Sequence, residues 1–292
     1  MRVSVGSADD VHVLHNALAR LREYKRGEHA RPLTLHLKNC GTALRFLQVH
    51  LERCYAGEPI TLTGDQRLIE RMGAPTTQTT SARILHGDAV PYSADESPYI
   101  TMSRKVLEAY KHLPRGAEPA ELIEADWSAA AFWYEYVAIH GGELLLKGLA
   151  DQSLQGDRIV ADIYASHFGV QTTFTPAGAL IFQSSNLQIL ESSNKSRLTL
   201  DFNACPDLYP AVALTAERLG IALQATGTER LAYKESDRLE AVARHETRHD
   251  HRMAMALLAA DYPADDTDCI AKSYPAFLSE LARVRGGKAR VS

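Results

Sequence analysis

Short strand-like segments alternate along the chain with helices that begin after a small or acidic residue. Such starts occur at residues 9–10 (Asp-Asp), 97–98 (Ser-Pro), 156–157 (Gly-Asp) and 236–237 (Ser-Asp). Residues of this kind are favoured at helix N-termini because they can bind the free backbone amides of the first turn. The units resemble a degenerate repeat of cap, helix and returning strand, although their spacing is too irregular for a fixed period. Strands are predicted at residues 59–63, 143–147, 180–183 and 198–202.

This alternation predicts an α/β or α+β architecture. The 292 residues fit about two domains, at roughly 100 to 200 residues each. A segment rich in Pro, Gly and Glu, residues 113–121, is the best candidate for a hinge between them. We therefore expect one domain at residues 1–121 and a second at residues 122–292.

Composition and charge argue against several classes of protein. A formal net charge of -4 does not suit a general nucleic-acid binder, which needs a broad basic surface. The four cysteines lack Cys-x-x-Cys spacing, so neither a zinc site nor a disulfide framework is indicated. The sequence contains no signal-peptide pattern and no apolar run of about eighteen residues, so we expect a cytoplasmic protein without a membrane partner. Any positively charged site must then be local.

Fixed charges concentrate in two short segments, residues 234–238 (Lys-Glu-Ser-Asp-Arg) and residues 250–255 (Asp-His-Arg-Met-Ala-Met). In a helix, Lys234 and Arg238 would share one face because they are four residues apart. Glu235 would lie to one side of that face, with a carboxylate that could move a proton. Together the segments suit a small, multiply anionic substrate, whereas a solvated helix of mixed charge explains either one alone.

A third group, residues 39–45, places Gly41 and Thr42 where a helix should start. Backbone N–H groups at a helix start can bind an anion with the help of the helix dipole. A plain N-terminal cap explains the same residues equally well.

Two further groups also have alternative interpretations. Arg67 and Arg71 form an i,i+4 pair whose guanidinium groups suit a carboxylate or phosphate, but a solvent-exposed pair is about as good an explanation. Asp207 is expected to cap the helix that runs to Gly220, and a role as a base needs independent support.

Motifs in a fixed order along the chain supply that support. They are NCGTALR (39–45), LTGDQRLIER (62–71), SPYI (97–100), SLQGD (153–157), CPD (205–207), KESDRL (234–239), DHRMAM (250–255) and AKSYP (271–275). The series resembles the EPSP synthase (3-phosphoshikimate 1-carboxyvinyltransferase) family. The UDP-N-acetylglucosamine enolpyruvyl transferases fit less well, because the KESDR and DHRMAM pair belongs to the shikimate branch. The resemblance implies a two-domain enolpyruvyl transferase fold of repeated βαβαββ units, several of them truncated here, with the active site in the cleft between the domains.

The resemblance also implies a reaction. The family transfers the enolpyruvyl group of phosphoenolpyruvate to the 5-hydroxyl of shikimate 3-phosphate through a tetrahedral intermediate and releases phosphate. This step belongs to the shikimate pathway, which leads to chorismate and the aromatic amino acids. The family uses no metal and no organic cofactor, so none is expected here. The expected partners are the two substrates, and the protein is expected to be a monomer.

Roles follow from motif position. By resemblance, Asp207 would accept the proton of the attacking hydroxyl, and Glu235 with Lys234 would deliver a proton to the methylene carbon of phosphoenolpyruvate. The residues that would hold phosphoenolpyruvate are Arg71, Arg238, Arg252 and Lys272, assisted by Asn39, Gly41 and Thr42. Ser97 and Tyr99 would face the phosphate of shikimate 3-phosphate.

Two family motifs are missing. The N-terminal signature, a lysine and serine followed by Ser-Asn-Arg, is not found, and residues 76–81 (Thr-Thr-Gln-Thr-Thr-Ser) do not match the Ser-Ser-Gln motif. A helix-strand unit between Arg238 and Asp250 is also compressed. The sequence can be an incomplete version of a full-length enzyme, an inactive family member or fragment that acts as an anion-binding or interaction protein, or a short enzyme with another acceptor. The intact charged motifs favour the first explanation.

Overall fold

The computed structural model describes residues 8–28, 32–66, 68, 82–84, 102, 104–105, 108, 124–184 and 197–287. The chain divides into two compact units, residues 1–112 and residues 113–292, and each has its own hydrophobic core. The domain boundary expected after residue 121 stays a prediction. Among the described residues, no helix has the length and apolar character needed to cross a membrane.

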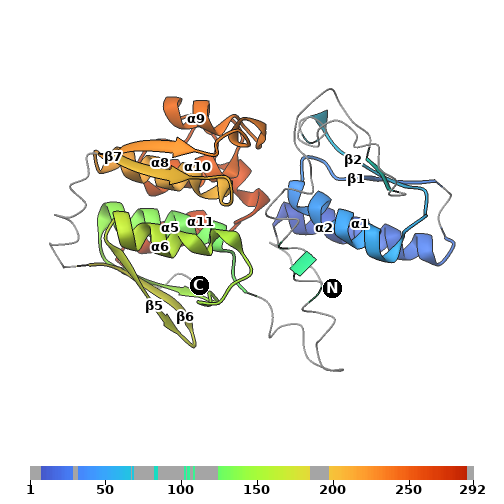
Figure 1. The fold of residues 1–292 in the computed structure, drawn as a ribbon, viewed down its shortest axis with the longest axis horizontal. Coiled ribbons are helices and arrows are strands. Elements are labelled where there is room, and N and C mark those ends of the chain that lie inside the picture. Colours follow the sequence, from blue (N-terminus) through green and yellow to red (C-terminus); the bar gives the residue numbers. More distant parts are fainter. Residues whose placement is uncertain are drawn as a thin grey trace. The chain divides into compact units, whose positions relative to one another are not determined.

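The first unit packs two helices on a parallel sheet (Figure 1). The sheet order is β1 (Leu33–His36), β2 (Ile60–Thr63) and β3 (Ala82–Ile84), with Leu33 opposite Ile60. Alternate residues of β1 are buried, as expected for a strand with one face on the core. That face meets α1 (Asp9–Lys25), which also packs on α2 (Gly41–Cys54).

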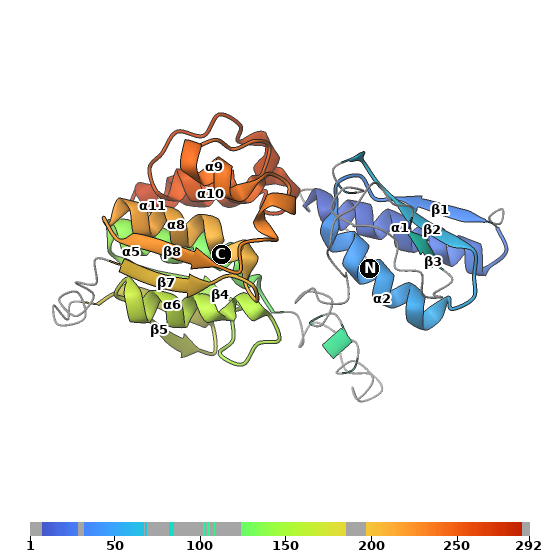
Figure 2. The same cartoon turned by 45° about the horizontal axis from the view of Figure 1, so that its top comes forward.

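The second unit places helices between two sheets (Figures 1 and 2). The antiparallel sheet comprises β4 (Glu143–Lys147), β5 (Val170–Thr175) and β6 (Gly178–Gln183) in the order β4-β6-β5; β7 (Arg197–Asp201) and β8 (Ala222–Thr226) form a parallel pair. The antiparallel sheet contacts α5 (Trp127–His140) and α6 (Val160–His167), whereas α8 (Tyr209–Arg218) contacts β8 and α5. These helices therefore form an inner layer.

Helix α5 can lie inside the unit because it is apolar on every side. The Asp126 carboxylate caps it by accepting the backbone N–H of Ser128 at 2.8 Å. Its one acidic residue, Glu135, is fully buried, and neither carboxyl oxygen has a hydrogen-bond partner. Burial raises the pKa of Glu135 well above its ordinary value, so the neutral acid is favoured.

The C-terminal part of the second unit is helical. It contains α9 (Arg238–Arg244), α10 (His251–Ala259) and α11 (Phe277–Arg285), and the unit also has 3-10 turns η3 (Gly156–Ile159), η4 (Pro206–Leu208), η5 (Leu231–Tyr233) and η6 (Asp268–Lys272). The continuously described stretch 227–287 contains no strand, and only residues 245–250 join α9 to α10. The connection is therefore short, and its compression relative to the family stays a prediction.

Three residues of this connection have left-handed backbone conformations. The φ angles of His245, Arg248 and His249 are 54°, 50° and 59°. Residues other than glycine adopt this region at a cost, so surrounding contacts must hold it. Asp265 accepts the backbone N–H of Thr247 at 2.9 Å, and Asp266 lies 2.6 Å from His249 Nδ1.

All four predicted strands are present. They correspond to β2, β4, β7 and the second part of β6. Asp237 caps α9, where its Oδ1 accepts the N–H groups of Leu239 and Glu240 at 3.1 and 3.3 Å. The predicted helix start at residues 97–98 lies outside the described residues. The combination of helices with parallel and antiparallel strands confirms the predicted α/β (α+β) class.

Candidate active site

The charged residues of the second unit meet at the start of α10. Asp250 is the N-cap of this helix, and its Oδ1 accepts the backbone N–H of Arg252 at 2.9 Å. Oδ2 of Asp250 accepts hydrogen bonds from Nε of Arg238 at 2.8 Å and from Oγ of Ser236 at 3.1 Å. Asp250 and Arg238 are 0% and 1% exposed. Two buried charges of opposite sign thus compensate each other and fix the position of the helix start.

The Arg238–Asp250 pair is charged. Burial by itself would raise the pKa of Asp250, but the positive charge of Arg238 and its hydrogen bonds outweigh burial and lower the pKa. Burial likewise opposes the charge of Arg238, but Asp250 and Asp207 raise its pKa above the ordinary value. The pair therefore acts as a fixed internal framework at neutral pH.

Asp207 is the meeting point of three cations. Its Oδ1 lies 2.6 Å from Nη1 of Arg238 and 3.0 Å from Nζ of Lys234, and its Oδ2 lies 3.2 Å from Nη2 of Arg252. Asp207 lies in η4, and the N-cap position of α8 is Leu208. The prediction that Asp207 caps this helix is therefore wrong. The Asp207 carboxylate instead forms ion pairs with residues that are far away in the sequence.

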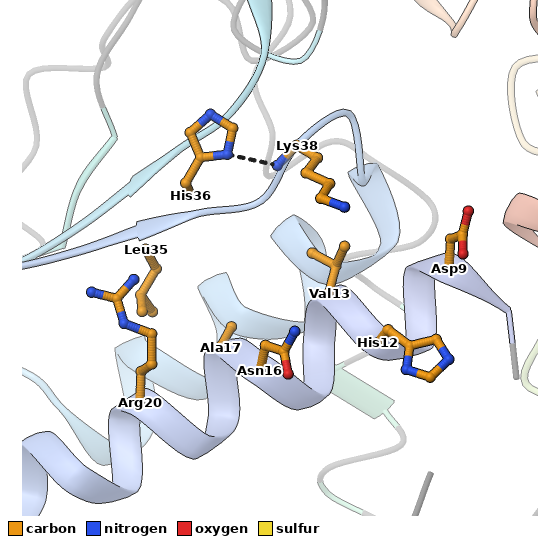
Figure 3. A pocket seen from close by; sticks show the side chains of 9 residues that line it. All are labelled: Asp9, His12, Val13, Asn16, Ala17, Arg20, Leu35, His36 and Lys38. Atoms are coloured by element: carbon orange, nitrogen blue, oxygen red, sulfur yellow. Dashed lines mark hydrogen bonds between the residues drawn. The ribbon is translucent and has the colours of Figure 1, made fainter. Parts of the chain in front are cut away.

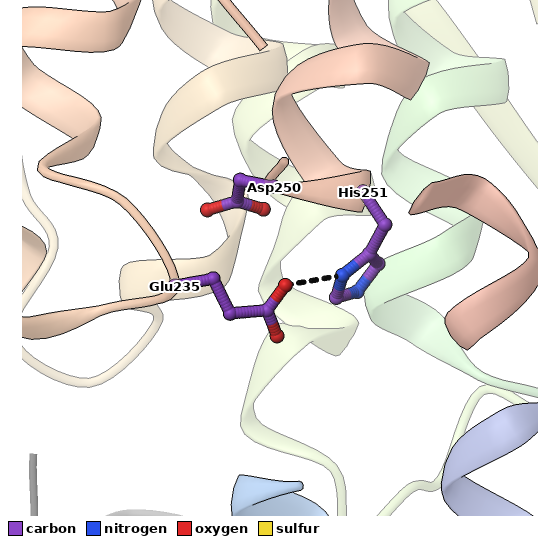
Figure 4. Close-up of side chains that lie close together, drawn as sticks. All are labelled: Glu235, Asp250 and His251. Carbon is purple, nitrogen blue, oxygen red and sulfur yellow. Dashed lines mark hydrogen bonds and ion pairs between the residues drawn. The ribbon is translucent and has the colours of Figure 1, made fainter. Parts of the chain in front are cut away.

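Glu235 lies between a histidine and a lysine. Its Oε2 is 2.7 Å from Nδ1 of His251, and its Oε1 accepts Nζ of Lys272 at 2.7 Å. Figure 4 shows Glu235 and His251 facing each other beside Asp250. His251 was not among the predicted site residues, although its place directly before Arg252 in a charged motif is a signal that could have identified it.

Lys234 and Arg238 reach Asp207 without sharing a helix. Turn η5 ends at Tyr233, Lys234 is extended, and α9 begins only at Arg238. The expectation of a common helix face is therefore wrong. Lys234 and Ser236 are buried, whereas Glu235 and Asp237 are partly exposed, so burial alternates along this non-helical segment.

The geometry favours an anion over a metal ion. Ligand atoms of Glu235, Asp250 and His251 lie within 4.8 Å of one another. Glu235, however, is bound by Lys272 and Asp250 is bound by Arg238. A divalent cation would have to displace these positive groups, whereas an anion would be attracted by them.

A further buried acid, Asp157, lies near enough to Asp207 to feel its charge. Oγ of Ser128 donates a short hydrogen bond to its Oδ2, and its Oδ1 has no hydrogen-bond partner. Burial, followed by the negative charge of Asp207, raises the pKa of Asp157 to about 7. Asp157 ends the SLQGD motif. The motif thus places an acid that can exchange a proton near neutral pH.

The predicted substrate-binding residues of the first unit are only partly described. Asn39, Gly41 and Thr42 lie at the start of α2, where Sγ of Cys40 accepts the N–H of Ala43 at 3.2 Å. The predicted helix start is therefore confirmed, and anion binding there stays a prediction. The described part of the chain does not include four residues that the sequence motifs singled out, namely Arg67, Arg71, Ser97 and Tyr99. The site that the structure brings together comprises Asp207, Lys234, Glu235, Arg238, Asp250, His251, Arg252 and Lys272.

The fold is that of an α/β enolpyruvyl transferase. An EPSP synthase from Acinetobacter baumannii superposes with a TM-score of 0.50 at 18% identity, covering 88% of this chain and 79% of the other. A family model described as EPSP synthase (3-phosphoshikimate 1-carboxyvinyltransferase) matches residues 111–248. The chain is therefore similar to the EPSP synthase family in both sequence and fold.

Relatives named 3-phosphoshikimate 1-carboxyvinyltransferase extend the comparison. The protein of Methanospirillum hungatei is 28% identical over 270 residues, which are 82% of this chain and 56% of the relative. The protein of Methanosphaerula palustris is 26% identical over 353 residues, covering 88% of this chain and 81% of the relative. For the first relative, the match thus spans little more than half of its length. The second match is longer than the chain itself, so this relative contains segments that the chain lacks.

Proposed function

We propose that this protein transfers the enolpyruvyl group of phosphoenolpyruvate to the 5-hydroxyl of shikimate 3-phosphate and releases phosphate. The observation that carries the proposal is the arrangement of two carboxylates, Asp207 and Glu235, each held by cations in one largely buried cluster. The relatives that bear the name of this activity support the choice of substrates.

In this proposal the more accessible cations bind the substrate anion. The side chains of Lys272, Arg252 and Lys234 are 18%, 15% and 11% exposed. They can exchange part of their contact with carboxylates for the phosphate or carboxylate of phosphoenolpyruvate. Arg238 is nearly inaccessible, and its guanidinium is bound to Asp207 and Asp250. It is better placed to position these carboxylates than to touch the substrate.

Proton transfer falls to the two carboxylates. In the addition step, the acceptor oxygen forms a bond to C2 of phosphoenolpyruvate, Asp207 takes the hydroxyl proton, and C3 gains a proton from Glu235. In the elimination step, a proton returns from C3 of the tetrahedral intermediate to Glu235, the C2=C3 double bond forms again, and the bond from C2 to the phosphate oxygen breaks. The departing phosphate takes the proton that Asp207 had accepted. His251 and Lys272 hold Glu235 in one orientation, and fixed orientation is what such transfers need. Lys234 forms an ion pair with Asp207. In this proposal it therefore holds the base in place and binds the substrate anion.

An anion-binding protein without turnover is the second candidate. The cations of the described cluster all have carboxylate partners already. A relative also has segments that this chain lacks. Both observations fit a protein that binds a substrate anion but lacks groups needed for catalysis.

Phosphate release, measured with both substrates together and with each alone, tests the proposal. We expect release only when both are present. Glu235→Gln should lower the rate by about two to four orders of magnitude, the usual contribution of a positioned acid or base. Glu229→Gln, at an exposed glutamate nearby in the sequence, is the matched control and should leave the rate unchanged. A folded protein that binds phosphoenolpyruvate but releases no phosphate would favour the second candidate.

A further inference from the structure

The first unit contains a pocket whose lining the proposed function does not use. It lies between α1 and the end of β1 and has a volume of about 220 Å³ (Figure 3). Helix α1 contributes polar residues three or four positions apart, and therefore on one face, namely Asp9, His12, Asn16 and Arg20. His36 and Lys38 line the opposite side, and Val13, Ala17 and Leu35 supply the apolar part.

The fixed positive charges of this pocket are not neutralised within the described part of the chain. Neither Arg20 nor Lys38 has a described carboxylate within ion-pair distance. The one carboxylate that lines the pocket is Asp9, in the first turn of α1, where the helix dipole favours a negative charge. The ring of His36 is already engaged, because its Nδ1 accepts the N–H of Lys38 and its Nε2 lies 3.6 Å from Oδ1 of Asp65. The guanidinium of Arg20, the ammonium of Lys38 and the amide of Asn16 line one small space. Such a set of donors attracts an anion.

The turn that carries Lys38 is tightly fixed. Its backbone has a φ of 51°, a conformation that glycine adopts more easily than lysine. The N–H of Lys38 donates to Nδ1 of His36 at 3.2 Å, and its carbonyl accepts the N–H of Asp65 at 3.0 Å. A Cβ atom at Gly64 would lie 2.4 Å from this carbonyl, so the close approach requires glycine there. Surroundings that enforce a costly conformation on one residue are typical of functional positions.

We infer that this pocket binds a small phosphate monoester. Lys38 and Arg20 supply the charge that a phosphate dianion requires, and Asn16 adds an uncharged donor. The Lys38 side chain extends from its turn toward Val13 of α1 (Figure 3), so the ammonium group lies over the apolar part of the pocket. The volume is below the roughly 300 Å³ at which pockets for drug-sized ligands begin, which limits the ligand to a metabolite of a few carbons. The inference does not depend on the second-unit site, because none of these residues belongs to it.

Nuclear magnetic resonance of the 15N-labelled full chain, titrated with inorganic phosphate, tests the inference residue by residue. We expect saturable shifts of the backbone amides of residues 12–20 and 36–38. Lys38→Met, which removes the charge and keeps the length of the side chain, should weaken binding there about fivefold, as expected for one partly exposed ionic contact. Arg22→Met is the matched control on the same helix, outside the pocket, and should bind phosphate as the unaltered chain does.

The same spectra distinguish this inference from the proposed function. Shifts at residues 250–252 and 272 without shifts at residues 12–20 and 36–38 would overturn the pocket and leave the second-unit site standing. Shifts in the first unit that sodium chloride reproduces at equal ionic strength would also overturn it, as would equal weakening by Lys38→Met and Arg22→Met. If Lys38→Met disturbs the turn, Arg20→Met provides the second variant, with the same fivefold loss expected.

Discussion

The two charged regions of the molecule differ in whether their cations have carboxylate partners. In the second unit, the four cations Lys234, Arg238, Arg252 and Lys272 contact the three carboxylates of Asp207, Glu235 and Asp250. In the first-unit pocket, exposed Arg20 and Lys38 have no such partner among the described residues. Burial explains the difference, because a charge removed from water needs a compensating partner, whereas an exposed charge remains hydrated.

The difference has consequences for ligand binding. The second-unit cluster keeps its geometry without a ligand, since each charge is already held. An anion that enters it must compete with the internal carboxylates. The first-unit cations need no such exchange, but exposed side chains lose mobility when they bind. We therefore expect substitutions in the first-unit pocket to change chiefly affinity, whereas substitutions in the second-unit cluster should change stability as well as affinity.

The largest effect on stability is expected at Arg238. Arg238→Met leaves Asp207 and Asp250 buried with fewer positive partners, which should lower the free energy of unfolding by about 3 to 5 kcal/mol. Urea denaturation followed by tryptophan fluorescence reports on this unit, because both tryptophans, Trp127 and Trp133, lie in it. Arg244→Met is the control: this exposed arginine pairs with Glu240, and its loss should cost less than about 1 kcal/mol. Equal costs would mean that burial of the ion pair is not what matters.

Glu135 sharpens the rule that buried charges need partners, because it is buried without a hydrogen-bond partner and burial favours its neutral form. Its pKa is raised by burial, so the unfolded chain loses this proton at a lower pH than the folded protein does. The Glu135 carboxyl therefore makes the protein less stable as the pH rises above the ordinary pKa of a glutamate. Glu135→Met should stabilise the second unit by about 1 to 3 kcal/mol at pH 8 and by less at pH 5.

Urea unfolding at the two pH values measures this change. Glu143→Met, at an exposed position of β4, serves as the control and should give the same small effect at both. A destabilised Glu135→Met protein at pH 8 would show that the buried carboxyl has a favourable contact.

Asp207 tests the competition between internal carboxylates and ligand. Asp207→Asn removes the negative charge that three cations share, so phosphoenolpyruvate should bind about tenfold more tightly, a change typical of one buried charge contact. Turnover should fall at the same time, because the proposed base is lost. Calorimetric titration and phosphate release measure the two quantities, and weaker binding would argue that Asp207 itself contacts the ligand favourably.

The smallest effect on stability is expected in the first unit. Lys38→Met should change the free energy of unfolding by less than about 0.5 kcal/mol, since an exposed side chain without a described ion pair contributes little. Circular dichroism during urea denaturation measures this. A loss comparable to that of Arg238→Met would show that Lys38 is part of an internal ion pair, and the contrast between the two regions would fail.

Local elements were predictable from the sequence because their signals are local. Strand β4 is predicted by its apolar run at residues 143–147, and Asp237 predicts the start of α9 as a cap. The conformation of Lys234 was not predictable in this way. Its ion pair with Asp207, and the bond from Ser236 to Asp250, hold residues 234–237 outside the helix although the charge spacing suits a helix.

Contacts across the site were predictable only through the family resemblance, and then incompletely. Motif order drew attention to Glu235 and Lys272, but their ion pair joins residues 37 positions apart. Neither this pair nor the contact of His251 with Glu235 follows from spacing, because both depend on how η6 and α10 pack. The first-unit pocket could not be predicted either, since it exists only where α1 faces the end of β1.

Binding of phosphoenolpyruvate alone, measured by isothermal titration calorimetry, tests most directly whether the second-unit cluster is the substrate site. We expect Arg252→Met to weaken binding at least about tenfold, as the loss of a hydrogen bond between charged groups should. Arg244→Met, at an exposed arginine of the same unit, should leave the affinity unchanged. Equal affinities of the two variants would contradict the account, because the paired cations around Asp207 would then be an internal ion network and not a site.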